Sequence, residues 1–302
     1  MCGLGATLKA QNLYVVNEDD GTIGEYVLDG STVNASLITG LGFPLNVAIS
    51  GNDLFVANGG SVGEYTTSGA TVNSSLISGF NSPWGIAVSG SDLFVAGFYS
   101  GTIGEYTTSG TTVNASLIST GHYGLVNMVI SGSDMFVAND QTGTVGEYGL
   151  DGSTVNASLI SGLSAPVGIA ISGNDLFVAN EGTGTISEYT TSGVLVNASL
   201  ITGLSQPQGI AISGNNLFVA NANIGIVGEY GLNGSTVNAS LIAGLYYPFG
   251  IAISPVPEPS AGALAGVGAA ALWRWRRRKW FGPLFPRHLL KWRRFFLFRD
   301  GR

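Results

Sequence analysis

The sequence predicts an all-β fold, a six-bladed β-propeller of four-stranded antiparallel blades with a short C-terminal helix. Two observations carry this prediction. A unit of about 40 residues recurs six times along the chain. Each unit holds four short segments rich in Val, Ile, Phe, Tyr and Thr, bounded by turn residues. Such a unit cannot bury two apolar faces alone, so the units are expected to close into a ring.

The four segments follow one another in a fixed order. Segment A resembles Gly-Ile-Ala-Ile-Ser, segment B Leu-Phe-Val-Ala-Asn, segment C Val-Gly-Glu-Tyr and segment D Val-Asn-Ala-Ser-Leu-Ile. Segment A is expected at residues 45–50, 84–89, 126–131, 167–172, 208–213 and 249–254. Segment B begins at Leu13, Leu54, Leu93, Met135, Leu176 and Leu217. The A–B and C–D connections contain Ser-Gly, Asp-Gly or Asn-Gly, which are typical of tight hairpins.

The propeller is expected to span residues 11–254, with residues 1–10 a remnant of a signal peptide or an N-terminal extension. The chain from Gln11 starts at segment B, so the last segment A, ending at Ser254, completes the first blade. This closure removes the free edge of the sheet. An alternative aligns Gly5–Lys9 with segment A and leaves the C-terminal copy surplus, but that copy fits the repeat far better.

These repeats resemble those of NHL-type and related six-bladed β-propellers, in which a strand like Gly-Ile-Ala-Ile leads into Leu-Tyr-Val-Ala-Asp/Asn. The resemblance covers about residues 11–254. It implies the architecture and leaves the activity open, because propellers serve binding, scaffolding and catalysis alike.

Charge is divided sharply between the body and the tail. Between Ala10 and Pro259 there is no Lys or Arg, whereas all but one of the 19 Asp and Glu lie there. All but one of the 12 Lys and Arg follow Ser260. A body this acidic repels phosphate backbones, so no nucleic-acid partner is expected. The single Cys excludes an intrachain disulfide.

The C-terminal segment 255–279 resembles the PEP-CTERM sorting signal of exported bacterial proteins. Val256, Pro257, Glu258 and Pro259 precede the apolar stretch Ala261–Trp273, which is followed by a basic cluster that includes Arg276, Arg277 and Arg278. The resemblance implies export, recognition by an exosortase-type sorting protease, and a cell-surface or extracellular destination. The apolar stretch makes about 20 Å of helix, less than the apolar core of a bilayer, so transient inner-membrane contact is expected rather than a permanent anchor.

Residues 280–302 extend beyond the usual end of such a signal. They are basic and aromatic, and include Lys291, Trp292 and Arg293. They fit an interfacial membrane segment. They fit equally well a tail translated past a lost stop codon.

Loop diversity predicts which face of the ring carries a site. The A–B and C–D turns are nearly identical in all copies, whereas the D–A and B–C loops, which lie together on the other face, differ. Polar and aromatic candidates from these loops and the adjoining strand starts are Trp84, Phe98, Tyr99, His122, Tyr123, Gln208, Tyr246, Tyr247 and Phe249. Acids accompany them in the B–C loops, among them Glu18, Asp140 and Glu181. Aromatic rings beside acids suit a polysaccharide or peptide ligand. Alternatively, the rings plug the mouth of the central channel.

Catalysis has few candidates. Gluconolactonase-type propellers hold a divalent metal with converging carboxylates, and virginiamycin B lyase, a seven-bladed propeller, uses a His-based site. Here segment A contains no Asp, Glu or His, and its channel-side polar candidates are Asn46 and Asn127. Two amides make a poor site for a hard cation, so no metal or other cofactor is expected.

We therefore predict an exported, non-catalytic binding or extracellular-matrix module. The alternative is a lactonase- or lyase-type enzyme acting at the variable face. A third reading is a structural filler without a ligand.

Overall fold

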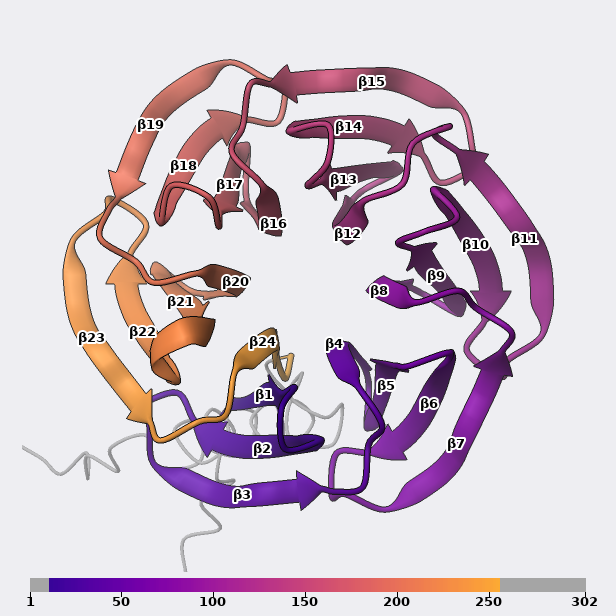
Figure 1. Ribbon diagram of the computed structural model, residues 1–302, viewed down its shortest axis with the longest axis horizontal. Helices are drawn as coiled ribbons and strands as arrows, with labels where there is room; N and C mark the ends of the chain where they lie inside the picture. Colours follow the sequence, from indigo (N-terminus) through magenta and orange to yellow (C-terminus); the bar gives the residue numbers. More distant parts are fainter. Residues whose placement is uncertain (1–10, 256–302) are drawn as a thin grey trace, which may run out of the picture. The chain divides into compact units, whose positions relative to one another are not determined.

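Six four-stranded antiparallel sheets surround a central axis (Figure 1). The structure is a computed structural model that describes residues 11–255. The predicted six-bladed propeller is confirmed. We number the blades from the N-terminus, so that blade 1 contains β24, β1, β2 and β3, and blade 2 contains β4–β7.

Each blade contributes one strand to each of four concentric rings. The inner strands are β4 (Pro44–Ser50), β8 (Pro83–Ser89), β12 (Leu125–Ser131), β16 (Pro166–Ser172), β20 (Pro207–Ser213) and β24 (Pro248–Ile253). The second strands are β1 (Asn12–Asn17), β5 (Asp53–Asn58), β9 (Asp92–Gly97), β13 (Asp134–Asn139), β17 (Asp175–Asn180) and β21 (Asn216–Asn221). These two rings correspond to segments A and B.

The outer half of each blade corresponds to segments C and D. The third strands are β2 (Thr22–Val27), β6 (Ser61–Thr66), β10 (Thr102–Thr107), β14 (Thr144–Gly149), β18 (Thr185–Thr190) and β22 (Ile226–Gly231). The outer strands are β3 (Thr32–Ile38), β7 (Thr71–Ser78), β11 (Thr112–Ser119), β15 (Thr154–Ser161), β19 (Leu195–Ile201) and β23 (Thr236–Ala243). A 3-10 helix, η1 (Ala222–Ile224), joins β21 to β22.

The ring closes as the sequence predicts, through the last inner strand. β24 pairs antiparallel with β1, placing Leu13 opposite Ile253 and Val15 opposite Ile251. The backbone N–H of Ser254 donates to the carbonyl of Asn12 at 2.8 Å, and the Gln11 side chain donates to the Ser254 carbonyl at 3.0 Å. Blade 1 therefore joins the two ends of the described chain, and no inner strand is surplus.

Burial falls steeply from the second strands to the rim. The second strands are buried on both sides, and their phenylalanines, such as Phe94 and Phe177, are almost inaccessible because they pack between neighbouring blades. The outer strands, in contrast, expose five consecutive residues each, as in β11 and β15. The apolar contacts that hold the ring together therefore lie between blades and near the axis.

The Gly-Glu-Tyr motif has a packing cause. In β14, a Cβ added to Gly146 would lie 2.7 Å from a ring carbon of Tyr148, because the tyrosine ring lies over the glycine. Blade 5 has Ser187 at this position, and Tyr189 is only partly buried, whereas Tyr148 and its other counterparts are buried. Glycine at this position therefore leaves room for the tyrosine ring, which can then be buried.

Residues 11–255 include no helix long and apolar enough to cross a membrane. The predicted C-terminal helix, with its apolar stretch 261–273, lies outside the described residues, as do the sorting motif and the tail 280–302. A membrane-crossing helix therefore has no support among the described residues, and the stretch expected to make transient membrane contact lies outside them.

Candidate functional site

The start of each inner strand defines a ring of side chains around the axis. The second residue of the six inner strands is Leu45, Trp84, Val126, Val167, Gln208 and Phe249. Five of these are apolar, and together with Phe98, Ala138 and Tyr247 they form one cluster. Gln208 is the polar member of the ring and is only 2% exposed. On the D–A face, the packed side chains of this cluster therefore form the floor of the channel mouth.

Aromatic rings dominate this floor. Trp84 stacks on Phe98 with ring centroids 4.3 Å apart, and Phe249 meets Trp84 edge-on at 5.6 Å. The Trp84 indole N–H donates to the Ser82 hydroxyl at 2.8 Å. Three predicted site residues, two from blade 3 and one from blade 1, thus meet near the axis, as the alternative of a plugged channel mouth also anticipates.

One residue deeper, the channel wall carries the two predicted asparagines. The Asn46 amide donates to Asn127 Oδ1 at 3.1 Å, across Gly85 of the intervening blade. Each Oδ1 also accepts the next backbone N–H of its own strand, from Val47 and Met128. Blades 5 and 6 have glycine here, and a Cβ on Gly168 would lie 2.1 Å from the Gln208 carbonyl oxygen. The two amides therefore chiefly bind each other and the strand backbone.

The remaining predicted residues lie further from the axis. Tyr99, Tyr123 and Tyr246 are exposed, by 62%, 56% and 63%. Tyr99 still meets Phe98 edge-on at 4.9 Å. His122 is exposed and lines a separate pocket with Thr120 and Asn139. His122 is thus not part of the axial cluster.

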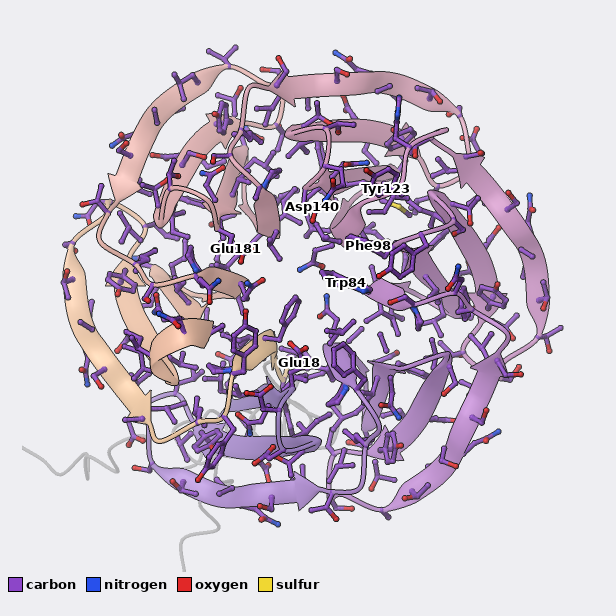
Figure 2. The ribbon with its side chains drawn as sticks, viewed as in Figure 1. Glu18, Trp84, Phe98, Tyr123, Asp140 and Glu181 are labelled. Atoms are coloured by element: carbon purple, nitrogen blue, oxygen red, sulfur yellow. The ribbon has the colours of Figure 1, made fainter. Side chains whose placement is uncertain are left out.

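Acidic side chains from three equivalent loops surround the same mouth. Glu18, Asp140 and Glu181 each directly follow the second strand of their blade, in blades 1, 4 and 5. Figure 2 shows them gathered near the axis with Trp84 and Phe98. We call these three residues the acidic arc. Burial, with a contribution from Asp19, raises the pKa of Glu18 to about 7. Burial likewise raises the pKa of Asp140, and the charge of Glu181 adds to the effect.

Sequence reasoning missed Gln206, which bridges this region. Its amide donates to Glu181 Oε1 at 3.2 Å, and the Tyr247 hydroxyl donates to its Oε1 at 3.4 Å. The only sequence signal is that Gln206 precedes a proline at the start of an inner strand. Positive φ occurs at the residue before this proline in four blades: Ser82, Ala165, Gln206 and Tyr247. Pre-proline residues disfavour this conformation, so the surrounding structure holds these loops in strained backbone.

The opposite face carries a repeated pattern of acid pairs. In four blades the glutamate before the third-strand tyrosine lies near the aspartate that begins the second strand. Burial together with that aspartate raises the pKa of Glu64, Glu105, Glu147 and Glu188. Blades 1 and 6 have Asn there, and Asn216 donates to Glu229 at 2.7 Å. The glutamates of these two blades accept hydrogen bonds from side-chain amides. Among residues 11–255 no group of three or more His, Cys, Asp or Glu could hold a metal ion.

The fold and the site define a six-bladed β-propeller with one repeated and one variable face. The sequence matches the virginiamycin B lyase family over residues 3–258 and the PEP-CTERM protein-sorting motif over residues 255–279. The first match covers most of the chain, so the chain belongs to the virginiamycin B lyase family. The second indicates an exported protein. Both predicted resemblances, to NHL-like propellers and to PEP-CTERM signals, are confirmed. No curated protein matches the chain.

Solved structures agree on the fold. The nidogen/laminin complex contains a chain that is 16% identical, with a TM-score of 0.72, and the match covers 82% of this chain and 100% of that one. Catalytically inactive virginiamycin B lyase from Staphylococcus aureus with quinupristin is 19% identical, with a TM-score of 0.57, over 79% of this chain and 87% of that one. A gluconolactonase from Xanthomonas campestris is 15% identical, with a TM-score of 0.60, over 70% and 80%. At these identities the likeness establishes the architecture alone.

Proposed function

We propose that this chain is an exported, non-catalytic binding module whose ligand docks on the variable face, at the mouth of the central channel. The observation that carries the proposal is the contrast between faces within one chain. Six copies keep the A–B and C–D turns nearly constant, whereas the other face gathers aromatic and acidic side chains around the axis. Diversity over a constant scaffold is how repeat proteins build binding surfaces.

The amides of the channel wall favour binding over chemistry. Asn46 and Asn127 hydrogen-bond each other and their own strands, so they have little capacity left to position a reacting group. The aromatic rings of the floor pack on one another. The exposed tyrosines at the rim remain accessible to a ligand, since tyrosine offers a large, rigid contact surface.

The binding experiment compares matched rim residues. The full chain is applied to arrays of glycans and peptides, and Tyr123→Ala and Tyr246→Ala are compared with Val155→Ala and Val237→Ala, which are exposed to a similar degree on outer strands. We expect the tyrosine variants to weaken capture of the ligand and the valine variants to leave it unchanged. Equal capture by all four variants contradicts a site on the variable face.

Sorting through the PEP-CTERM signal is the second part of the proposal. An exosortase-type protease would recognise Pro257–Pro259, with Arg276, Arg277 and Arg278 held on the cytoplasmic side and the apolar stretch in transient contact with the inner membrane. Deleting residues 257–302 should change the localisation of the protein in a host that has the protease. Unchanged localisation counts against this route.

An enzyme is the second candidate function, and family membership favours it. A lyase or lactonase would act at the same face, where Glu18, Asp140 and Glu181 are the available carboxylates. Turnover of a lactone or of quinupristin by the full chain, lost in Glu181→Gln, would replace the binding proposal. If the full chain turns over neither substrate but still captures a ligand, the result supports the binding proposal.

A further inference from the structure

Five of the six D–A loops place an apolar side chain between consecutive blades. Each of these side chains belongs to the same apolar cluster as the third-strand tyrosine of the blade that follows its loop. Phe80, for example, meets Tyr106 edge-on with ring centroids 5.6 Å apart. We call these five side chains the plug residues: Leu41, Phe80, Leu163, Leu204 and Leu245.

The D–A loop between blades 3 and 4, which lies within the described residues, has no plug residue. Backbone packing identifies the counterpart of the missing side chain. A Cβ added to Gly143 would lie 2.5 Å from the carbonyl oxygen of the plug residue Leu163, and a Cβ added to Gly101 would lie 2.3 Å from the carbonyl oxygen of His122. His122 therefore takes the place of a plug leucine. It is exposed, and no residue of loop 120–124 belongs to the apolar cluster that holds Tyr148.

A pocket of about 150 Å³ lies where this plug residue is missing. Val137 and Tyr148 of the apolar cluster form part of its wall. Their counterparts in blade 2 are Val56 and Tyr65, which share a cluster with the plug residue Leu41. The walls that a leucine packs against in blade 2 are thus left open in blade 4.

The polar groups of the pocket wall are already paired within the chain. The Thr120 hydroxyl donates to a carbonyl of its own loop at 2.9 Å. Asn139 Oδ1 accepts the backbone N–H of Thr142 at 3.0 Å, and Asn139 Nδ2 donates to the Tyr123 carbonyl at 3.1 Å. The Thr142 and Thr144 hydroxyls bond each other at 2.7 Å. Because these groups have partners, an occupant gains most by burying apolar surface against the rest of the wall.

We propose that the pocket between blades 3 and 4 binds an aliphatic side chain of leucine size from a peptide ligand. The other junctions of the same ring support this choice, since four of their five plug residues are leucine. Tyr123 directly follows His122 and is 56% exposed, so it offers a rigid contact surface for the rest of the peptide. This inference rests on the proposed function and names a ligand class for one place on the variable face.

The first test asks which side chain the pocket accepts. The full chain is titrated with the blocked peptide Gly-Gly-Leu-Gly-Gly, and separately with the same peptide carrying alanine in place of leucine, while amide chemical shifts are followed by NMR. We expect the leucine peptide to shift residues 120–125, Val137 and Tyr148. The alanine peptide should bind at least about tenfold more weakly, because alanine buries three fewer carbon atoms.

The second test fills the pocket from within the chain. His122→Leu supplies the missing plug residue and should raise the melting temperature and weaken binding of the leucine peptide at least about tenfold. Loop 120–125 is one residue longer than its counterpart 162–166. A second variant therefore replaces residues 120–125 by Gly-Leu-Ser-Ala-Pro, the sequence of residues 162–166, and should have the same effects. Asn81→Leu is the control, because it adds a leucine at an exposed position of a loop whose plug residue, Phe80, is present. It should leave binding unchanged.

Four outcomes overturn the proposal. Equal binding of the two peptides shows that the pocket does not recognise an aliphatic side chain. Shifts confined to other loops place the peptide elsewhere. Unchanged binding in both filled variants, or equal weakening by Asn81→Leu, separates binding from the pocket. If the leucine peptide does not bind while an array ligand is captured through Tyr123 and Tyr246, this inference fails and the proposed function stands.

Discussion

The two faces of the ring are built from the same six repeats, and yet they differ in how far packing restricts the residues of their loops. On the repeated face, the A–B and C–D turns recur with the same residues, because each must fit the neighbouring blade: a Cβ on Gly152 would lie 2.8 Å from the Leu117 carbonyl oxygen of blade 3. On the variable face, equivalent positions hold Glu18, Phe98 and Asp140. Packing between blades therefore fixes one face and leaves the other free to vary.

The strongest way to break this comparison is to truncate a large side chain in each region. Phe177 lies in a second strand and is 1% exposed, whereas Tyr246 lies on a variable loop. We expect Phe177→Ala to lower the free energy of unfolding by about 3–5 kcal/mol, from lost burial and the cavity left behind. Tyr246→Ala should change it by no more than about 0.5 kcal/mol. Chemical denaturation measures both, and comparable losses would contradict the division.

A smaller effect is expected at the glycine beneath the tyrosine of each third strand. Gly146→Ser should destabilise the ring by about 1–3 kcal/mol, because the new Cβ displaces the buried ring of Tyr148. Blade 5 supplies the control. Ser187 already occupies this position, and its hydroxyl accepts the Asn180 amide at 3.0 Å. Ser187→Gly should change stability less than Gly146→Ser in thermal denaturation. An equal or larger loss in Ser187→Gly would argue against the ring-over-glycine explanation.

The sequence alone was enough to predict the number of blades, the strand order and the closure by the last inner strand. Repetition made this possible, since six copies report the same pattern and weak signals reinforce one another. The site was harder to predict from the sequence. Trp84 and Phe98 belong to blade 3 and Phe249 to blade 1, so the contact between Trp84 and Phe249 depends on the closed ring.

Other features of the site depend on loop conformation, for which the sequence gives only a weak signal. Gln206 has a φ of 51° before proline and hydrogen-bonds both Glu181 and Tyr247. His122 is a predicted candidate from a D–A loop, and the structure places it at a pocket with Thr120 and Asn139, apart from the axial cluster. A loop residue's distance from the axis follows from the loop conformation, which the repeat pattern does not determine.

The smallest expected effect is a pH dependence that originates on the repeated face. The glutamates of the four acid pairs have pKa values raised above the ordinary value of 4.5. A raised carboxyl pKa means that the folded state binds more protons than the unfolded one, so stability falls as pH rises from the ordinary value through the folded pKa. Glu18 on the variable face, with a pKa of about 7, extends this fall toward neutral pH.

Replacing the aspartates of these pairs by asparagine reproduces the asparagine–glutamate pairs that blades 1 and 6 already contain. The combined change of Asp53, Asp92, Asp134 and Asp175 to Asn should raise the melting temperature at pH 7 and reduce its fall as pH rises above 4.5, because it removes the charge that helps to raise the glutamate pKa values. Asp29→Asn is the control. Hydrogen bonds from Ser31 lower the pKa of Asp29, so this variant should give no gain. A melting temperature that rises with pH in the unmodified chain would contradict the assignment.

The most direct test of a variable binding face on a constant scaffold is amide hydrogen exchange of the full chain, with and without a saturating ligand identified in the array experiment. We predict added protection in residues 18–21, 140–143, 181–184, 204–208 and 245–249, with none in the A–B and C–D turns. Protection concentrated in those turns or in the outer strands would contradict the account.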